Sequence, residues 1–153
     1  MDTSLRVRLV AVALEWQVKF GIAPSITTAL SEYDAALLVG CLEPDYVLQM
    51  QNRTAVTKGS DFFFGGKHYQ VKANRPSGKK GSKPSITNKA TNYNWDYLIW
   101  MLYDEKYVLL EAWLWEVEDY KARFHNQTYV RPNDLREGMP LFINGRQDVV
   151  VNS

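Results

Sequence analysis

Apolar residues recur every three or four positions in the first third of the chain, and this period predicts two helices. The first helix is expected from Leu5 to Phe20, with a Ser or Thr cap before it and Gly21 after it. Its apolar face consists of Leu5, Leu9, Val12, Trp16 and Phe20. The second helix follows Pro24 and ends near Gly40, and its stripe consists of Ile26, Ala29, Leu30, Tyr33, Leu37 and Leu38.

The pattern changes after Pro44-Asp45, where apolar and polar residues alternate in the manner of a strand with one buried face. This strand is expected over residues 46–53. A hairpin follows, with one strand over residues 61–64, a tight turn at Gly65-Gly66 and a second strand over residues 67–73. Three successive strands are therefore expected after the two helices.

The second half of the chain begins with a long polar segment. Residues 74–94 contain almost no apolar side chain and are predicted to form a loop. Two strands over residues 97–103 and 107–115 are expected to pair as a second hairpin, and residues 116–124 return to a helical pattern. Helices and strands in this order predict an α/β fold, and the length of 153 residues predicts a single domain over residues 1–153.

Composition narrows the class of protein. The chain carries 18 Lys and Arg against 17 Asp and Glu, a formal net charge of +1, which argues against a uniformly basic nucleic-acid binder or an acidic disordered tail. No apolar run approaches the roughly 20 residues of a membrane span. Cys41 is the single cysteine and no secretory leader pattern is present. We therefore expect a cytoplasmic protein that does not enter a membrane.

The near-neutral total conceals a segregation of charge. Residues 62–95 contain seven basic residues and no acid, whereas residues 96–125 contain seven acids against three bases. The basic residues are Lys67, Lys72, Arg75, Lys79, Lys80, Lys83 and Lys89. A segment of this charge suits a polyanion, because each neutralised phosphate releases counterions. A solvated loop that is charged for solubility is the alternative.

Three side chains on the first hairpin suggest metal-dependent phosphodiester chemistry, which needs oxygen ligands for Mg²⁺ and a cation near the phosphate. Asp61 opens one strand. Gln70 and Lys72 are two residues apart on the next strand and therefore project from one face. If Gly65-Gly66 makes the turn, Asp61 and Gln70 lie nearly opposite each other. The alternative is an ordinary amphipathic hairpin in which Asp61 caps a turn.

These residues resemble the PD-(D/E)xK pattern of the restriction-endonuclease-like superfamily, here in its Q-x-K form, with Asp61, eight residues, and then Gln70-Val71-Lys72. The resemblance covers roughly residues 25–125 and implies a mixed central sheet flanked by helices. It implies that the metal is held by Asp61, Gln70, the backbone carbonyl of Val71 and an acid on an N-terminal helix. Glu32 is the candidate for that acid.

Other acids compete for these places. Glu15 replaces Glu32 if the first helix packs against the site instead. The structural alternative for Glu32 itself is an N-terminal helix charge that complements the helix dipole. Asp45, in a literal Pro-Asp pair, competes with Asp61, although a turn is the simpler role for that pair.

The resemblance implies a DNA endonuclease that depends on Mg²⁺, with Mn²⁺ as a substitute. Lys72 would orient water and offset charge on the phosphate. The DNA-binding candidates are Lys67, Arg75, Lys79, Lys80, Lys83 and Lys89. A homodimer is expected for cleavage of both strands. The alternatives are a non-catalytic nucleic-acid or protein interaction module of the same fold, because Gln70 weakens the metal site, and a nuclease that resolves Holliday junctions.

Overall fold

The computed structural model describes residues 4–53, 59–77 and 86–145. These residues form a five-stranded sheet in the order β1-β2-β3-β4-β5. The strands are β1 (Phe62–Phe64), β2 (Lys67–Asn74), β3 (Tyr97–Tyr103), β4 (Leu109–Glu116) and β5 (Met139–Ile143). β2 and β3 run parallel, and the other neighbouring pairs are antiparallel. The expected α/β fold with a mixed sheet is therefore confirmed.

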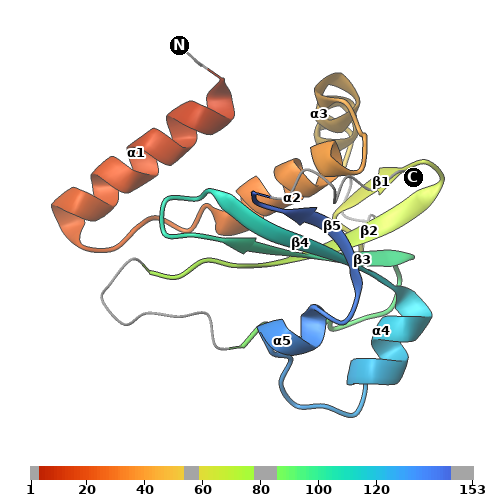
Figure 1. Cartoon of the computed structure of the whole chain (residues 1–153). Helices are drawn as coiled ribbons and strands as arrows, with labels where there is room; N and C mark the ends of the chain where they lie inside the picture. The colour runs from red at the N-terminus through yellow and green to blue at the C-terminus, as the bar shows by residue number, and fades with distance from the viewer. Residues whose placement is uncertain (1–3, 54–58, 78–85, 146–153) are drawn as a thin grey trace.

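Helices cover both faces of this sheet (Figure 1). The helices are α1 (Leu5–Phe20), α2 (Thr27–Leu38), α3 (Glu43–Gln51), α4 (Val117–Phe124) and α5 (Pro132–Leu135). α2 and α3 lie on one face, and α4 and α5 lie on the other (Figure 1). Among the described helices, none is long and apolar enough to cross a membrane.

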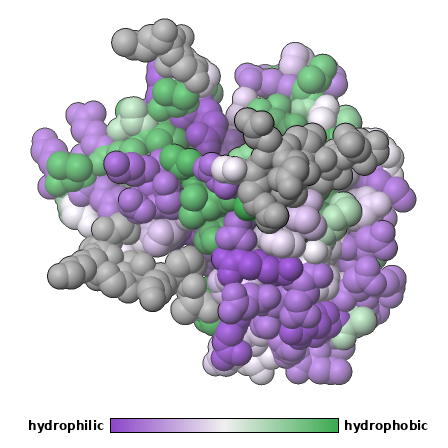
Figure 2. All heavy atoms as spheres, in the orientation of Figure 1, coloured by the Kyte–Doolittle hydropathy of each residue, from purple (hydrophilic) through white to green (hydrophobic). Residues whose placement is uncertain are grey.

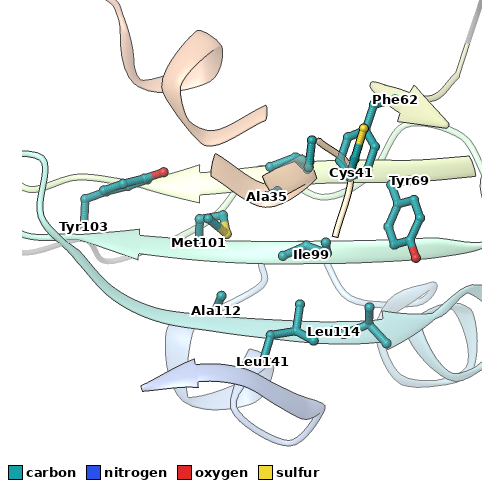
Figure 3. Packing of buried hydrophobic residues seen from close by; sticks show 12 residues of the cluster. Ala35, Cys41, Phe62, Tyr69, Ile99, Met101, Tyr103, Ala112, Leu114 and Leu141 are labelled. Atoms are coloured by element: carbon teal, nitrogen blue, oxygen red, sulfur yellow. The ribbon is translucent and has the colours of Figure 1, made fainter. Parts of the chain in front are cut away.

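The central strand β3 explains how the sheet is buried on both faces. Ile99, Met101 and Tyr103 face α2 and join the cluster shown in Figure 3. Leu98 and Trp100 alternate with them and pack on the opposite face against α4. A strand covered on both sides reads as a continuous apolar run, which is the pattern of residues 97–103.

The two cores differ in their side chains. The core under α2 combines the small residues Ala35, Ala36 and Ala112 with larger side chains of β1, β2 and β3, so that the helix backbone lies close to the sheet. The core under α4 is aromatic and contains Trp95, Trp100, Trp115, Tyr120 and Phe124. Alternate residues along each strand point to opposite faces of the sheet, so the same strands supply side chains to both cores.

α1 lies apart from these two layers (Figure 1). Its bounds agree with the sequence prediction, since Ser4 accepts a hydrogen bond from the Val7 N–H and Gly21 closes the helix with a φ of 85°. Inward contacts are few: Ala13 is buried and packs in a small cluster with Leu30 and Tyr107. The helix is thus held by one narrow face.

A partly buried polar contact fixes the start of α1 to α2. Arg6 donates from Nε and Nη2 to the two carboxylate oxygens of Asp34 at 2.7 Å each. The Tyr103 hydroxyl donates to Asp34 Oδ2 at 2.7 Å. Asp34 therefore joins α1, α2 and β3, and these bonds offset the burial of its charge.

The strand expected over residues 46–53 is wrong, because residues 43–51 form α3. Pro44 stands in the first turn, where its missing N–H costs nothing, and Glu43 and Asp45 complement the helix dipole. Tyr46 and Met50 are four residues apart and pack against the core under α2. The alternation of apolar and polar residues over residues 46–53 therefore belongs to a helix that packs through one narrow face.

The later strands are shifted relative to the prediction. β4 begins at Leu109 rather than at residue 107, because the turn after β3 is longer and Tyr107 adopts a positive φ of 65°. The fifth strand comes from residues 139–143, which carried no strand prediction. The three successive strands that the sequence predicted are thus a helix, α3, followed by the β1–β2 hairpin. Strand β5, from residues 139–143, completes the sheet.

Candidate active site

The β1–β2 hairpin brings Asp61 and Gln70 together. Phe62 pairs with Tyr69, so Asp61 falls opposite Gln70, and the Asp61 N–H donates to the Tyr69 carbonyl at 2.7 Å. The carboxylate oxygen Oδ2 of Asp61 accepts two bonds, from the Val71 N–H at 2.7 Å and from Gln70 Nε2 at 3.1 Å. These bonds fix the orientation of the Asp61 carboxylate.

The short length of β1 leaves an open edge beside this carboxylate. The pairing of β1 stops at Phe62, so beyond Gln70 the outer edge of β2 is not covered by a β1 residue. N–H and C=O groups of alternate residues in a strand point to the same edge. Since the Val71 N–H points to Asp61, the Val71 carbonyl also points towards the open edge.

Gln70 and Lys72 project from the face of β2 opposite to Tyr69, Val71 and Ala73, which pack in the core under α2. Both Gln70 and Lys72 are half-buried. Among the residues that the structure covers, the ion pairs with carboxylates are made by arginines, and none of them includes Lys72. Lys72 therefore has its ammonium group available for a ligand.

An open cavity of about 300 Å³ joins these groups to α2. It is lined by Thr27, Thr28, Ser31 and Glu32 of α2, by Asp61, by residues 70–74 of β2, and by residues 86–88. The sequence-predicted residues Glu32, Asp61, Gln70, Val71 and Lys72 are all among these lining residues. The structure thus brings the predicted catalytic and metal-binding candidates to one place.

Glu32 and Asp61 interact strongly. Burial of the Glu32 carboxyl, the negative charge of Asp61 and a hydrogen bond with Asp61 raise the pKa of Glu32 to about 7, against a smaller opposing effect of Arg53. Two carboxylates that converge without a cation between them favour retention of a proton. Glu32 therefore retains its proton to a higher pH than an exposed carboxyl group does.

Comparison with protein-family models and with curated protein sequences finds no match for this chain. The chemistry of the site is therefore inferred from its donor groups. Carboxylate, amide and carbonyl oxygens are hard ligands, the type that Mg²⁺ prefers, and Mg²⁺ sites commonly use only one or two carboxylates. In the described part of the chain, no group of three or more His, Cys, Asp or Glu residues is arranged to hold a metal.

The possible ligands at this site are oxygen atoms, and such ligands suit Mg²⁺ better than Zn²⁺. Glu32 and Asp61 supply two carboxylates, and Gln70 and the Val71 carbonyl supply neutral oxygens. The Gln70 amide now directs its nitrogen at Asp61. A half-turn about its last side-chain bond exchanges nitrogen for oxygen at the same place. Thiolate or imidazole ligands, which Zn²⁺ sites use, do not line this cavity among the described residues.

Sequence reasoning missed Arg53, whose charge acts on Glu32. Arg53 follows α3 and donates from Nη2 to the Ser60 carbonyl at 3.0 Å, so it connects the end of α3 to the residue before Asp61. The assignment of residues 46–53 to a strand hid this position. Its only signal in the sequence is a basic residue close to the start of the hairpin.

Sequence reasoning also missed polar residues on the walls of the cavity. Thr27 and Thr28 are in the first turn of α2, which starts without a side-chain cap. Asn74, at the end of β2, accepts hydrogen bonds from the Thr87 hydroxyl and from Trp100 Nε1. These bonds attach the segment after β2 to the sheet and so shape the cavity.

The competing acids lie elsewhere. Asp45 is in the first turn of α3 and does not line the cavity with Gln70. Glu15 is exposed on α1 and is not among the lining residues either. Of the weighed acids, Glu32 and Asp61 are therefore the two at the site.

The DNA-binding candidates are dispersed. Lys67 is exposed at the start of β2, and Lys89 donates to the carbonyl of His125. Arg75 lies over the Tyr107 ring at 4.0 Å and donates to Gln17 Oε1 at 2.9 Å, so its guanidinium holds α1 rather than facing the cavity. Lys79, Lys80 and Lys83 lie outside the described residues.

A larger cavity of about 540 Å³ lies between the end of α2 and the β4–β5 side of the sheet. Its walls include Leu38, Tyr69, Trp115 and Leu141, and no Lys, Arg or His of the described ranges is among its lining residues. A cation or a metal site favours a phosphate ligand, and the larger cavity carries acidic side chains instead. The smaller cavity at Asp61 is therefore the better candidate for phosphate chemistry.

Proposed function

We propose that the protein is a Mg²⁺-dependent DNA endonuclease with a restriction-endonuclease-like core, and that Mn²⁺ substitutes for Mg²⁺. The observation that carries the proposal is that Glu32, Asp61, Gln70 and Lys72 line one open cavity of about 300 Å³. Hydrolysis of a phosphodiester with a metal needs oxygen ligands and a cation close together. This cavity combines both.

The order of the elements supports the finer fold assignment. α2 precedes the β1–β2 hairpin and packs on it through Ala35 and Ala36, and β2 is followed by a crossover to the parallel strand β3. A hairpin that carries the site residues and packs against an N-terminal helix resembles the restriction-endonuclease-like core. α3, between α2 and β1, is an insertion relative to that expectation.

The chain's own groups would divide the work as follows. Asp61, held by the Val71 N–H and by Gln70, presents a carboxylate whose direction is already set. Glu32 and Asp61 would hold the metal together, and Glu32 would bind it as a carboxylate, because a divalent cation would offset both negative charges. A bound Mg²⁺ supplies Lewis-acid polarisation of the phosphate.

Lys72 would bind a non-bridging phosphate oxygen and hold the attacking water in line. Its stem starts from the same face of β2 as Gln70, and Lys72 lines the same cavity as the two carboxylates. Positioning and charge stabilisation of this kind act on the transition state more than on the bound DNA. Loss of Lys72 therefore affects turnover more than affinity.

The first turn of α2 supports a phosphate ligand. Thr27 and Thr28 line the cavity, and helix α2 starts there without a side-chain cap for its free N–H groups. The positive end of a helix dipole and hydroxyl donors both stabilise an anion. An extended polyanion at the cavity would thus meet donors from α2 as well as from β2.

The test is nicking of supercoiled plasmid with Mg²⁺ or Mn²⁺. We expect cleavage by the wild type, loss of at least about 100-fold in rate for Asp61→Ala and Lys72→Ala, and unchanged rate for the exposed turn variant Lys106→Ala. Duplex binding by Lys72→Ala should stay within about threefold of wild type, since one phosphate contact is a small share of the total. Cleavage that survives both site substitutions would refute the proposal.

Calorimetry separates the enzyme from its alternatives. Uptake of Mg²⁺ or Mn²⁺ that disappears in Asp61→Ala supports the metal site, whereas absence of uptake by the wild type favours a non-catalytic module. If cleavage occurs, comparison of a four-way junction with a linear duplex of the same sequence distinguishes a junction-resolving nuclease from a general endonuclease.

A further inference from the structure

The apolar face that predicts α1 is not buried by the rest of the described chain. The exposed fractions of its side chains are large: Leu5 73%, Leu9 37%, Val12 59%, Trp16 50% and Phe20 58%. The neighbouring face, with Ala13 inward, makes the contacts to α2 and Tyr107. We call the five exposed residues the α1 stripe.

The side chains of the α1 stripe lie next to one another on the helix. At about 100° per residue its five side chains fall within an arc of about 80°. The Trp16 and Phe20 rings contact each other with centroids 4.6 Å apart. At roughly 150–250 Å² for each large side chain, half-exposed residues of this kind present on the order of 500 Å². Figure 2 shows hydrophobic spheres along the arm that α1 forms at the left.

An area of this size is what one half of a small, weak interface offers. A standard interface buries about 800 Å² on each partner, and weaker specific interfaces bury less. Isolated exposed hydrophobic residues are ordinary, whereas the largest contiguous apolar patch of a monomer, typically about 300–600 Å², is often functional. The α1 stripe is thus large enough to form the centre of an interface.

The charges beside the stripe indicate that the partner is a second α1. Arg8, Glu15 and Lys19 follow one border of the stripe, and all three are exposed. When two copies of a helix pair antiparallel about a two-fold axis, the same borders face each other and position i of one copy meets position j of the other. An axis near Val12 places Arg8 of the first copy opposite Glu15 of the second copy, and Glu15 of the first copy opposite Arg8 of the second.

The same axis matches the apolar positions. Leu9 meets Trp16 of the second copy, Leu5 meets Phe20, and the two Val12 side chains meet at the centre. α1 has 16 residues and is therefore about 24 Å long, so each pair lies within the overlap.

Antiparallel pairing is thus complementary in both shape and charge. Parallel pairing would instead place the charged border of one copy against the opposite border of the other, which carries Ala13 and packs within its own chain. Arg8 and Glu15 would then find no partner charge across the pair, so the antiparallel arrangement is favoured.

We propose that the α1 stripe is a homodimer interface in which the α1 helices of two copies pack antiparallel about an axis near Val12. The proposal does not depend on the function of the cavity at Asp61. It assigns a role to an apolar helix face that the monomer leaves in solvent.

The first test is sedimentation equilibrium of the full chain, without DNA or metal. We expect a dimer at micromolar concentration, and a dissociation constant at least about tenfold higher for Trp16→Glu, because the charge would be buried at the interface. The matched control is Val18→Glu, since Val18 is 89% exposed on the same helix and lies outside the stripe. Circular dichroism checks that both variants stay folded.

A monomer at tens of micromolar, or a dimer unaffected by Trp16→Glu, would overturn the proposal. Binding of the monomer to phosphatidylcholine vesicles through the stripe would overturn it in favour of a lipid surface.

Cross-linking tests the orientation. Cys41 is 1% exposed, so an introduced cysteine is the reactive thiol. Mixed Leu5→Cys and tagged Phe20→Cys chains should form a disulfide-linked heterodimer under mild oxidation, whereas Val18→Cys should stay monomeric on a denaturing gel. The double variant Arg8→Glu with Glu15→Arg should keep the wild-type dissociation constant, and each single variant should raise it. Failure of the mixed pair to cross-link contradicts the antiparallel arrangement.

Discussion

The substitution Glu32→Gln removes one of the two carboxylates that converge at the cavity. Burial and the nearby Asp61 raise the pKa of Glu32 to about 7 from the ordinary value of 4.5. Folding therefore strengthens proton binding by Glu32. The free energy of unfolding is largest while Glu32 is protonated and decreases as the pH rises between about 4.5 and 7. Above that window the cost of the charged pair is constant.

The size of the effect follows from the pKa difference. From 4.5 to about 7, at about 1.4 kcal/mol per pKa unit, the cost is on the order of 3 kcal/mol before solvent is considered. Because the Glu32 side chain is only half-buried, screening reduces this to about 1–2 kcal/mol. The amide introduced by Glu32→Gln is neutral at every pH, so we expect this variant to be more stable than wild type by that amount at pH 8 and equal to it only near pH 4, below the ordinary pKa of 4.5.

Urea unfolding between pH 4 and pH 8.5, without divalent ions, measures this difference. The matched control is Glu105→Gln, which removes one negative charge from an exposed turn and should follow the wild-type pH dependence. Addition of Mg²⁺ at pH 8 should stabilise the wild type more than Glu32→Gln, because the ion relieves the repulsion between Glu32 and Asp61. Parallel pH profiles of wild type and Glu32→Gln would refute the raised pKa of Glu32, which burial and the charge of Asp61 produce together.

Three further substitutions test contacts in the fold away from the site, each by urea unfolding. Asp34→Ala should lower the free energy of unfolding by about 3 kcal/mol, since it leaves the partly buried Arg6 guanidinium without its carboxylate. Tyr107→Phe should be neutral or stabilising by up to about 1 kcal/mol, because the buried Tyr107 hydroxyl has no hydrogen-bond partner among the described residues. Gly138→Ala should destabilise by at least about 2 kcal/mol, since a Cβ there would lie 2.5 Å from Trp115 Nε1 and 2.8 Å from the Leu114 carbonyl; an unchanged midpoint for this variant would contradict the tight approach.

Local signals in the sequence were sufficient for the elements whose ends are marked by special residues. Ser4 and Gly21 bound α1 as predicted. Gly65 and Gly66, with φ of 59° and 79°, make the tight turn that sets the hairpin register. That register places Asp61 opposite Gln70, so the hairpin half of the candidate site was already specified by residues close together in the chain.

The same local reasoning failed where two patterns overlap. Residues 46–53 alternate apolar and polar side chains over a window that fits a strand, but Pro44 and the acids around it favour the start of a helix. α3 then packs with Tyr46 and Met50 inward. Whether this segment forms a helix or a strand depends on which of its side chains can be buried. Here they are buried against the sheet, whose strands come later in the chain.

Amino-acid order alone therefore determined the caps, the hairpin and the doubly buried strand β3, because each depends on neighbouring residues or on the alternation of one strand. Only the tertiary structure decided that Glu32 meets Asp61, a residue of a different element, and that the charge of Arg53 acts on Glu32. It also decided that the α1 stripe remains in solvent. These outcomes depend on how separate elements pack against one another. The contacts that decide the packing join residues that are far apart in the sequence.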